Sequence, residues 1–541
     1  MMRQTVCLLL AAACCGCMTT GNDSSNGHGG YALEERIWQL HDYDMAHIEH
    51  VIGLAPTYGA NRIQLSHGIV MFAEEVLEHE SRVQHFDLIC EAAHANGLAV
   101  DMWTHELNGV PDEYRPEGVV DFDNPGLWAW LTDKYERLFA VAPDLDGLVL
   151  TFHETAVSVY DDSRTRSALP KPQRVAKLID AVAEVCNARG KRLYVRTFAY
   201  RPHELHVIRD GIIAAKSDFT VMSKEVPHDW QPYYPPNPLL GDVGGRRQVV
   251  EMDPGAEYYG QSRVLYCAPE YMKMRLCYAI EKGVVGAVAR IERYNNHILD
   301  TPNEVNLYTL KRLWEDPSAD TEEIWLTWAR AEYGEKGAPY AVSALARTDD
   351  IINIVFFPVG FWLSGHSRLP GLGEIDHLMA THSTTKWLTE PDWVEMEKRI
   401  NNPDPDLLKR VWDDYERAIA MCEESLADIA RAKPLISKAK HGELLYYLSY
   451  VKDVAGIWQS HFDCYFRYKM LEQAVAGKSA EGVPDLETLR LWLAQGMARH
   501  GQRADEMERT YGAEIWPGRP GRARGFLEEI RKRVEQLDET Q

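Results

Sequence analysis

The chain has 541 residues, and its 81 Asp and Glu residues outnumber its 58 Lys and Arg residues, which gives a formal net charge of −23 at pH 7. Such an acidic chain is not expected to bind nucleic acid, because that affinity comes from neutralising phosphates with Lys and Arg. An anionic substrate would need a local positive pocket, since surface charge is screened beyond roughly 8 Å at physiological salt.

The first 16 residues have the pattern of a lipoprotein signal peptide, in which one Arg leads a short apolar run followed by small residues and cysteines. The run is too short to span a bilayer as a mature helix. Cys17 is the preferred lipidated residue and Cys14 the second choice, while a plain cleaved signal without lipid is the alternative. Residues 17–34 then form a polar tether. We therefore expect a lipid-anchored protein of the bacterial cell envelope, periplasmic or surface-exposed, whose only membrane contact is this anchor.

Residues 35–300 alternate short apolar runs with amphipathic stretches, which predicts a (β/α)8 barrel, an α/β fold. Two of the amphipathic stretches, 82–97 and 172–190, end in a Gly that is typical of a helix C-cap. An open doubly wound sheet is the alternative, and it is less favoured because no Gly-rich phosphate loop follows the first run. The eight predicted strands are 36–40, 62–66, 98–103, 147–152, 193–198, 219–223, 248–252 and 286–291.

Two features complete the predicted organisation. Five prolines and no helical pattern fill the interval between the sixth and seventh strands, as expected for a loop that walls an active site. After about residue 301 helical patterns dominate, so residues 301–541 are predicted to form a C-terminal α-helical domain that packs against the barrel.

Three carboxylates follow predicted strands: Glu154 after the fourth, Asp229 after the sixth and Glu257 after the seventh. Strand ends of a barrel lie together, and inverting hydrolysis of a sugar bond needs one carboxylic acid and one carboxylate base. Glu154 leaves an apolar strand, so we expect burial to raise its pKa and make it the acid. Asp229 and Glu257 could hold a water between them. The alternative for each residue is a structural cap.

Positive groups lie near the same strand ends. Arg196 is inside a predicted strand, where a buried guanidinium needs either an internal carboxylate or an anionic ligand. Lys224 and Arg293 follow other strands, and Arg290 lies near the end of the eighth. Lys224 and Arg290 are candidates for binding substrate.

The remaining candidates are residues that could contact a sugar. His105 and Glu106 end the third strand, and Trp230 and Tyr258 directly follow the two loop carboxylates. His105 and Glu106 could also bind a metal with His153. No HxH or HExxH spacing supports such a site, so neither metal nor other cofactor is predicted.

The segment from Lys224 to Gln261 resembles the α-glucuronidases of glycoside hydrolase family 67. The matching pieces are Lys224 itself, DWQP from Asp229, NPLLG from Asn237, VVEM, and AEYYGQ from Ala256. The interval of 28 residues from Asp229 to Glu257 (257 − 229) also agrees with that family. Weaker similarity covers DGLVLTFHE, YVRTFAY and NLYTLKRLWEDPSADTEEIWLTWA, which extends it into the helical domain.

The resemblance implies an inverting exo-glycosidase that releases a terminal uronic acid from an acidic oligosaccharide. Glu154 would be the general acid, Asp229 and Glu257 would share the general-base role, and Arg196 and Lys224 would hold the uronate. The sequence also departs from the family. Only the tether precedes the barrel, where the family carries an α/β domain, and Thr151 stands near the acid where the family has another Lys. These departures leave the sugar open.

Two other functions remain from the sequence. One is a retaining, hexosaminidase-like glycosidase with a substrate-assisted mechanism. The other is a surface glycan-binding lipoprotein that has lost catalysis. Nothing in the sequence excludes an oligomer.

Overall fold

The computed structural model describes residues 31–539, so the expected signal peptide and residues 17–30 of the expected tether lie outside the described residues. Among the helices of residues 31–539, none combines the length and the apolar character that crossing a bilayer requires.

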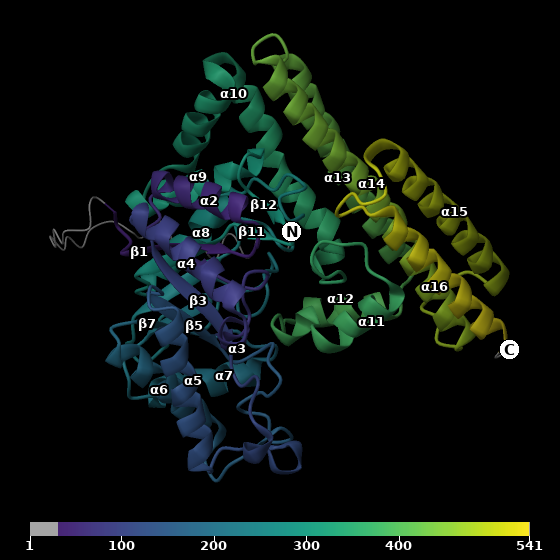
Figure 1. Ribbon diagram of the computed structural model, residues 1–541. Coiled ribbons are helices and arrows are strands. Elements are labelled where there is room, and N and C mark those ends of the chain that lie inside the picture. The colour runs from purple at the N-terminus through teal and green to yellow at the C-terminus, as the bar shows by residue number, and fades with distance from the viewer. Residues whose placement is uncertain (1–30, 540–541) are drawn as a thin grey trace.

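Eight parallel strands form a closed barrel in the order β1-β10-β9-β8-β7-β5-β3-β2 (Figure 1). All eight predicted strands are confirmed, and the open-sheet alternative is wrong because β1 pairs with both β2 and β10. The strands are β1 Glu35–Leu40, β2 Arg62–Leu65, β3 Ala99–His105, β5 Gly147–Thr151, β7 Arg192–Arg196, β8 Thr220–Lys224, β9 Gln248–Met252 and β10 Gly286–Arg290.

Helices follow most strands and surround the barrel, as in other (β/α)8 folds. They are α2 Met45–Leu54, α3 Ala73–Leu77, α4 Glu80–Ala95, α5 Pro125–Val141, α6 Lys171–Ala188, α7 Pro202–Ala214, α8 Pro269–Glu281 and α9 Val305–Glu315. The interval from β8 to β9 holds no helix, as the prolines predict. The helix after β10 is α9, which packs on α8 and therefore extends the barrel beyond residue 300.

Apolar side chains fill the barrel, so it is a packed core and not a pore. Seven buried residues on seven strands form this inner cluster: Ile37, Trp103, Val149, Tyr194, Met222, Val249 and Val288. Because the strands are parallel, the polar residues that follow them lie together at the carboxyl end of the barrel. (β/α)8 enzymes carry their active sites at this end. We call this end the barrel mouth.

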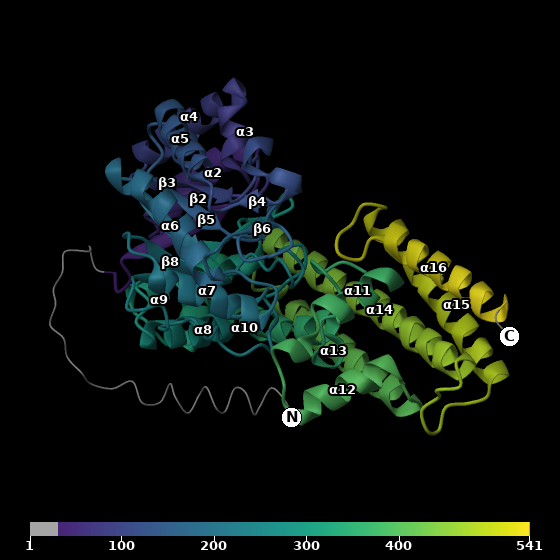
Figure 2. The ribbon, with the colours of Figure 1, turned by 90° about the horizontal axis from the view of Figure 1, so that it is seen from below.

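The rest of the chain is helical, as predicted. The helices are α10 Thr321–Phe356, α11 Leu372–Thr381, α12 Pro391–Asn401, α13 Pro405–Ala432, α14 Lys438–Val475, α15 Leu486–Tyr511 and α16 Pro520–Glu539. The long helices α10, α13, α14 and α15 pack against one another in chain order. In both views α11 lies between the barrel and α16, on which it packs (Figures 1 and 2). The segment around α11 thereby brings residues of the helical region to the barrel mouth.

Candidate active site

The three predicted carboxylates meet at the barrel mouth, in the loops after β5, β8 and β9. Their shared electrostatic environment shows that they are neighbours. Burial lowers the pKa of His153 to about 4 against the opposing charges of both Glu154 and Asp229. The charge of Glu257 in turn acts on the pKa of Asp229.

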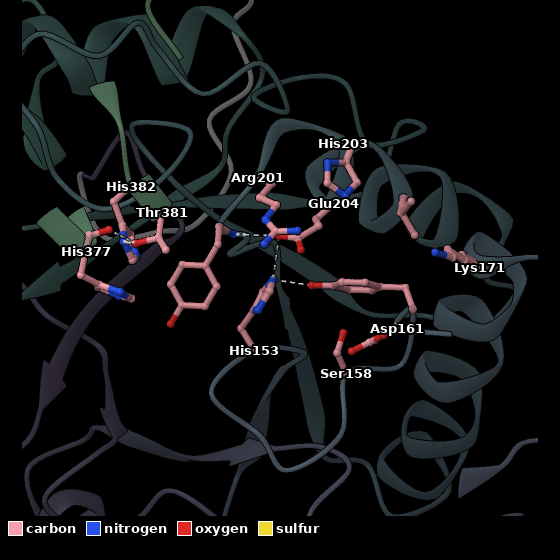
Figure 3. A pocket seen from close by; sticks show the side chains of 13 residues that line it. His153, Ser158, Asp161, Lys171, Arg201, His203, Glu204, His377, Thr381 and His382 are labelled. Atoms are coloured by element: carbon pink, nitrogen blue, oxygen red, sulfur yellow. Dashed lines mark hydrogen bonds and ion pairs between the residues drawn. The ribbon is translucent and has the colours of Figure 1, made fainter. Parts of the chain in front are cut away.

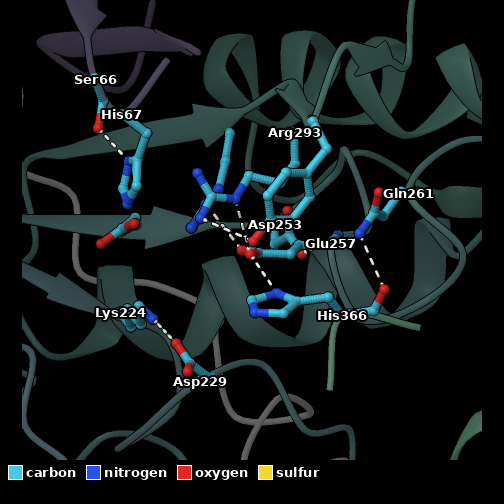
Figure 4. A network of polar contacts seen from close by, with 12 residues as sticks. Ser66, His67, Lys224, Asp229, Asp253, Glu257, Gln261, Arg293 and His366 are labelled. Atoms are coloured by element: carbon cyan, nitrogen blue, oxygen red, sulfur yellow. Dashed lines mark hydrogen bonds and ion pairs between the residues drawn. The ribbon is translucent and has the colours of Figure 1, made fainter. Parts of the chain in front are cut away.

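Glu257 is held on every side (Figure 4). One carboxylate oxygen lies 2.8 Å from an Arg290 nitrogen, and the other lies 3.0 Å from Arg293 Nε and 2.9 Å from His366 Nδ1. Burial alone would raise the pKa of Glu257, but Arg290 and Arg293 hold it well below its ordinary value. The two arginines therefore favour the ionised form of Glu257, and the contacts to Arg290, Arg293 and His366 fix the position of its carboxylate.

Close backbone approach places the Glu257 loop over β10. The Gly255 N–H donates to the Arg290 carbonyl at 2.8 Å, and a Cβ at Gly255 would come within 2.7 Å of that oxygen. Only a glycine permits this contact. The Glu257 N–H then donates to Asp253 Oδ2 at 2.7 Å, and Ser367 Oγ donates to the Glu257 carbonyl at 2.9 Å.

Asp229 is more accessible than Glu257, with 15% of its side chain exposed against 3%. It forms an ion pair with buried Lys224. Burial opposes ionisation, but Lys224 and His228 outweigh it and lower the pKa of Asp229 to about 2. Trp230, expected to contact a sugar, is instead fully buried and packs its ring under Lys224 and Arg290. Tyr258 is also buried and stacks on His366.

Arg196 has an internal partner, the first of the two alternatives that its position allowed. It donates two hydrogen bonds to Glu251 of β9, at 2.7 and 2.9 Å, and both side chains are buried. The mouth therefore contains Arg196 and Lys224 as expected, but each already has a protein carboxylate beside it.

Glu154 differs from the sequence-based expectation in its protonation. Its side chain is 33% exposed, and one carboxylate oxygen lies 3.6 Å from His105 Nε2 and 3.8 Å from His67 Nε2. Burial would raise the pKa of Glu154, but the two histidines outweigh it and hold that pKa well below the ordinary value. The expectation of a raised pKa for Glu154 is therefore wrong for the free protein. The apolar strand before Glu154 could not predict the two histidines, because they come from other strands.

Glu106 is not brought to the mouth. It is fully buried and contacts Lys134 and Tyr135 of α5. Lys134 also lies 3.0 Å from Glu74. A side chain closed off by this network cannot reach a sugar, so the expectation that Glu106 binds substrate is wrong. The residue before it, His105, does face the mouth through Glu154.

In the part of the chain that the structure describes, the alternative metal group of His105, Glu106 and His153 does not form. His153 instead contacts Tyr160 and lies 3.7 Å from Glu204. Within the described residues, the His105 imidazole groups with His67 and Glu154, with all three potential ligand atoms inside 4.8 Å of one another.

A cavity of about 610 Å³ opens beside His153, and we call it the lateral pocket (Figure 3). The loop after β5, the start of α7 and the end of α11 line it. Its wall mixes cationic, anionic and imidazole groups, including Lys171, Arg201, Glu204, His203 and His382. His382 stacks on His228 at 5.3 Å, and His228 precedes Asp229, so the lateral pocket adjoins the carboxylates.

The sequence did not predict four further residues of the site. His67 lies two residues after β2, and His105 ends β3. This shared position near strand ends was the signal that could have identified His67. His366 and Ser367 come from the helical region, more than 100 residues after Glu257, and no local pattern connects them to it. Trp362, packed against Tyr258, is missed for the same reason.

Comparisons with known proteins support the fold of this chain but identify no family for it. No protein-family model matches the chain, and no curated protein matches its sequence. A solved GH138 enzyme targeting pectin rhamnogalacturonan II has a similar structure, with a TM-score of 0.60 at 12% identity over 94% of this chain and 68% of its own. This likeness confirms the barrel with a helical C-terminal region.

Weaker likenesses have TM-scores below 0.5. A GH115 4-O-methyl-α-glucuronidase with specificity for decorated arabinogalactans reaches 0.49 at 11% identity, over 92% of this chain and 62% of its own. A mutant form of the O-GlcNAc hydrolase of Thermobaculum terrenum reaches 0.44 at 9% identity, over 94% of this chain and 96% of its own.

Proposed function

We propose that this protein is a glycoside hydrolase that releases a terminal acidic sugar from an oligosaccharide, with inversion at the anomeric carbon. The observation that carries the proposal is the convergence of Glu154, Asp229 and Glu257 at the mouth of a closed (β/α)8 barrel. Ionised carboxylates at this end of a barrel are what activation of water against a glycosidic bond requires.

Asp229 and Glu257 take the water-activating side of the reaction. Tyr258 lies in the field of both carboxylates, so the two share one environment. Asp229 is the more exposed and is the group that contacts water, while Glu257, fixed by Arg290 and Arg293, acts through its charge and through the position of Tyr258. Glu154 takes the leaving-group side of the reaction, where the departing oxygen must receive a proton. The histidines lower the pKa of Glu154, so this proton comes from the group that Glu154 forms with His67 and His105 and not from an isolated carboxyl.

An acidic sugar is favoured because four cations concentrate at the mouth of a chain whose net charge is −23. These are Arg196, Lys224, Arg290 and Arg293, each beside a carboxylate of the site. Their presence makes the mouth locally neutral, so an anion is not repelled there as it is from the rest of the surface. The lateral pocket, with its own Lys171 and Arg201, is where the remainder of the oligosaccharide would lie.

The test is incubation of the full chain with oligosaccharides capped by uronic acids, including pectin-derived ones, alongside neutral-capped counterparts. The released sugar is identified by mass spectrometry and its first-formed anomer by NMR. Release of the uronic acid with inverted configuration supports the proposal. Retention of configuration would support the hexosaminidase-like alternative, release of neutral sugars alone would remove the acidic specificity, and no release from any substrate would favour the glycan-binding alternative.

A further inference from the structure

Three side chains from adjacent strand ends face one another at the barrel mouth. His67 follows β2, His105 ends β3 and Glu154 follows β5, and these strands are neighbours in the barrel. Their two Nε2 atoms and one carboxylate oxygen all lie within 4.8 Å of one another. The arrangement is the product of barrel closure, because the residues are up to 87 positions apart (154 − 67).

Each histidine is fixed by its other ring nitrogen. His105 Nδ1 lies 2.8 Å from the Met71 carbonyl, which can only accept, so this nitrogen carries the proton. His67 Nδ1 lies 2.5 Å from Ser66 Oγ. A histidine whose Nδ1–H is held by a backbone oxygen presents a bare Nε2, which is how metal-binding histidines are oriented.

The His105 imidazole also faces Glu154. Its Nε2 is buried without a hydrogen bond, in a side chain that is 0% exposed, and it points at the Glu154 carboxylate. In a neutral His105 this nitrogen presents a lone pair to an anion 3.6 Å away, which is unfavourable unless a proton or a metal cation lies between them.

The separations favour a metal ion over a shared proton. A hydrogen bond between nitrogen and oxygen spans roughly 2.7–3.2 Å, shorter than either of the two contacts to Glu154. Two ligands bound at about 2.1 Å to a tetrahedral ion are roughly 3.4 Å apart, close to the 3.6 and 3.8 Å found here. The two contacts to Glu154 therefore already have the spacing of neighbouring ligands in a coordination shell.

We propose that His67, His105 and Glu154 bind a divalent transition-metal ion such as Zn²⁺, whose open coordination positions face the barrel mouth and take oxygen atoms of an anionic sugar. Two imidazoles and one carboxylate suit such an ion, whereas Ca²⁺ and Mg²⁺ prefer oxygen ligands. Glu154 is one-third exposed, so one side of the ion is open. The choice of an anionic sugar rests on the proposed function; the ion site does not.

A bound metal ion would supply positive charge that the side chains of the mouth do not leave free. The four cations of the mouth are balanced by four carboxylates: Glu251, Asp229, Glu257 and Glu154. No net positive charge is left for a uronate, although the sequence had required a positive pocket. A divalent ion supplies two positive charges and a direct ligand for a carboxylate or hydroxyl oxygen.

The first experiment measures bound metal without turnover. The full chain is stripped with EDTA, incubated with ZnCl₂, desalted and analysed by plasma mass spectrometry for zinc per chain. We expect the wild type to retain one Zn²⁺ more than the His67→Gln/His105→Gln double variant. His153→Gln, which removes a neighbouring histidine outside the triad, is the matched control and should equal the wild type. Equal zinc in the wild type and the double variant would overturn the site.

Folding is checked on the same samples, because the double variant could fail to fold. Thermal melts without zinc identify that case, and Glu154→Gln, at a partly exposed position, then replaces the double variant. Zinc should raise the melting temperature of the wild type and of His153→Gln, and it should leave the triad variants unchanged. A rise of the same size in the triad variants would also overturn the site.

The second experiment tests the sugar. Calorimetric titration of sodium glucuronate into the stripped and zinc-loaded wild type should show affinity at least about tenfold higher with zinc, whereas glucose should not discriminate. Equal glucuronate affinity in both forms would overturn the role of the ion in substrate binding. Zinc binding without any hydrolysis of acidic oligosaccharides would count against the proposed function and not against the site.

Discussion

Arg196 and Glu251 face each other inside the barrel from β7 and β9, joined by two hydrogen bonds of 2.7 and 2.9 Å. Both side chains are buried, so each charge depends on the other. The charges of both Arg196 and Glu251 also act on the pKa of Lys224, which is the ion-pair partner of Asp229.

Glu251→Gln should therefore destabilise the protein strongly. It leaves Arg196 charged and unpaired in the barrel, and removing one partner of a buried pair costs about 3–5 kcal/mol of unfolding free energy. Urea denaturation measures this loss. The double variant Arg196→Met/Glu251→Leu removes both charges and should recover part of the stability. If Glu251→Gln were as stable as the wild type, the buried charge of Arg196 would not need Glu251 as its partner.

Glu106→Gln should lower stability without changing substrate affinity. Its partners Lys134 and Tyr135 belong to α5 and not to the mouth. Thermal melting should show a lower midpoint, while KM for the acidic oligosaccharide stays at the wild-type value. Glu78→Gln, at an exposed position, is the control and should change neither quantity. A raised KM with normal stability would restore Glu106 to the substrate site.

How far the sequence predicts this molecule depends on the range of each interaction. Short apolar runs give the eight strands, because burial in a parallel barrel acts locally on each strand. The carboxylates follow from the same reasoning, since residues after strands converge at one end. The partner of Arg196 could not be predicted, because Glu251 comes within reach only when β7, β8 and β9 lie side by side.

The same dependence on contacts between distant parts of the chain explains why the pKa of Glu154 and the position of the Trp230 side chain were predicted wrongly. The pKa of Glu154 depends on His67, which is separated from it by the whole of β3 and the helices around it. Trp230 follows a catalytic candidate directly, yet its ring turns inward and lies under Lys224 and Arg290. Adjacency in the chain indicates which loop a residue occupies, but not which way its side chain points.

Gly255→Ala should impair turnover by displacing Glu257. The new Cβ would come within 2.7 Å of the Arg290 carbonyl, so the loop after β9 must move away from β10. We expect kcat to fall at least about tenfold, since small misplacements of catalytic groups are costly. Gly53→Ala, in α2 with open space around it, is the control and should keep full activity. Unchanged kcat in Gly255→Ala would mean that the position of Glu257 does not matter.

Acid should destabilise the helical region through His500. Burial lowers the pKa of His500 to about 3, from an ordinary value of 6.5. The unfolded chain therefore takes up a proton below about pH 6.5 that the folded chain refuses, and stability falls as the pH drops from 6.5 towards 3. The slope is up to about 1.4 kcal/mol per pH unit for one such group.

The measurement for His500 is urea denaturation at pH 7 and pH 5. His500→Gln should lose less stability between these values than the wild type does, by about 2 kcal/mol. His79→Gln, at an exposed position, is the control and should behave as the wild type. Parallel pH dependence in His500→Gln and the wild type would contradict the assignment. Stability above pH 7 should show no contribution from this group.

The central claim is that Asp229 and Glu257 serve hydrolysis of an acidic sugar bond, and sugar release by matched variants tests it most directly. The wild type, Asp229→Asn, Glu257→Gln and the control Asp144→Asn, exposed just before β5 at the other end of the barrel, are incubated with uronic-acid-capped oligosaccharides. Released uronic acid is quantified over time. We predict release by the wild type and by Asp144→Asn, and a loss of about 10²–10⁴-fold in the other two variants. Undiminished release by Asp229→Asn and Glu257→Gln, with folding confirmed by thermal melting, would contradict the account.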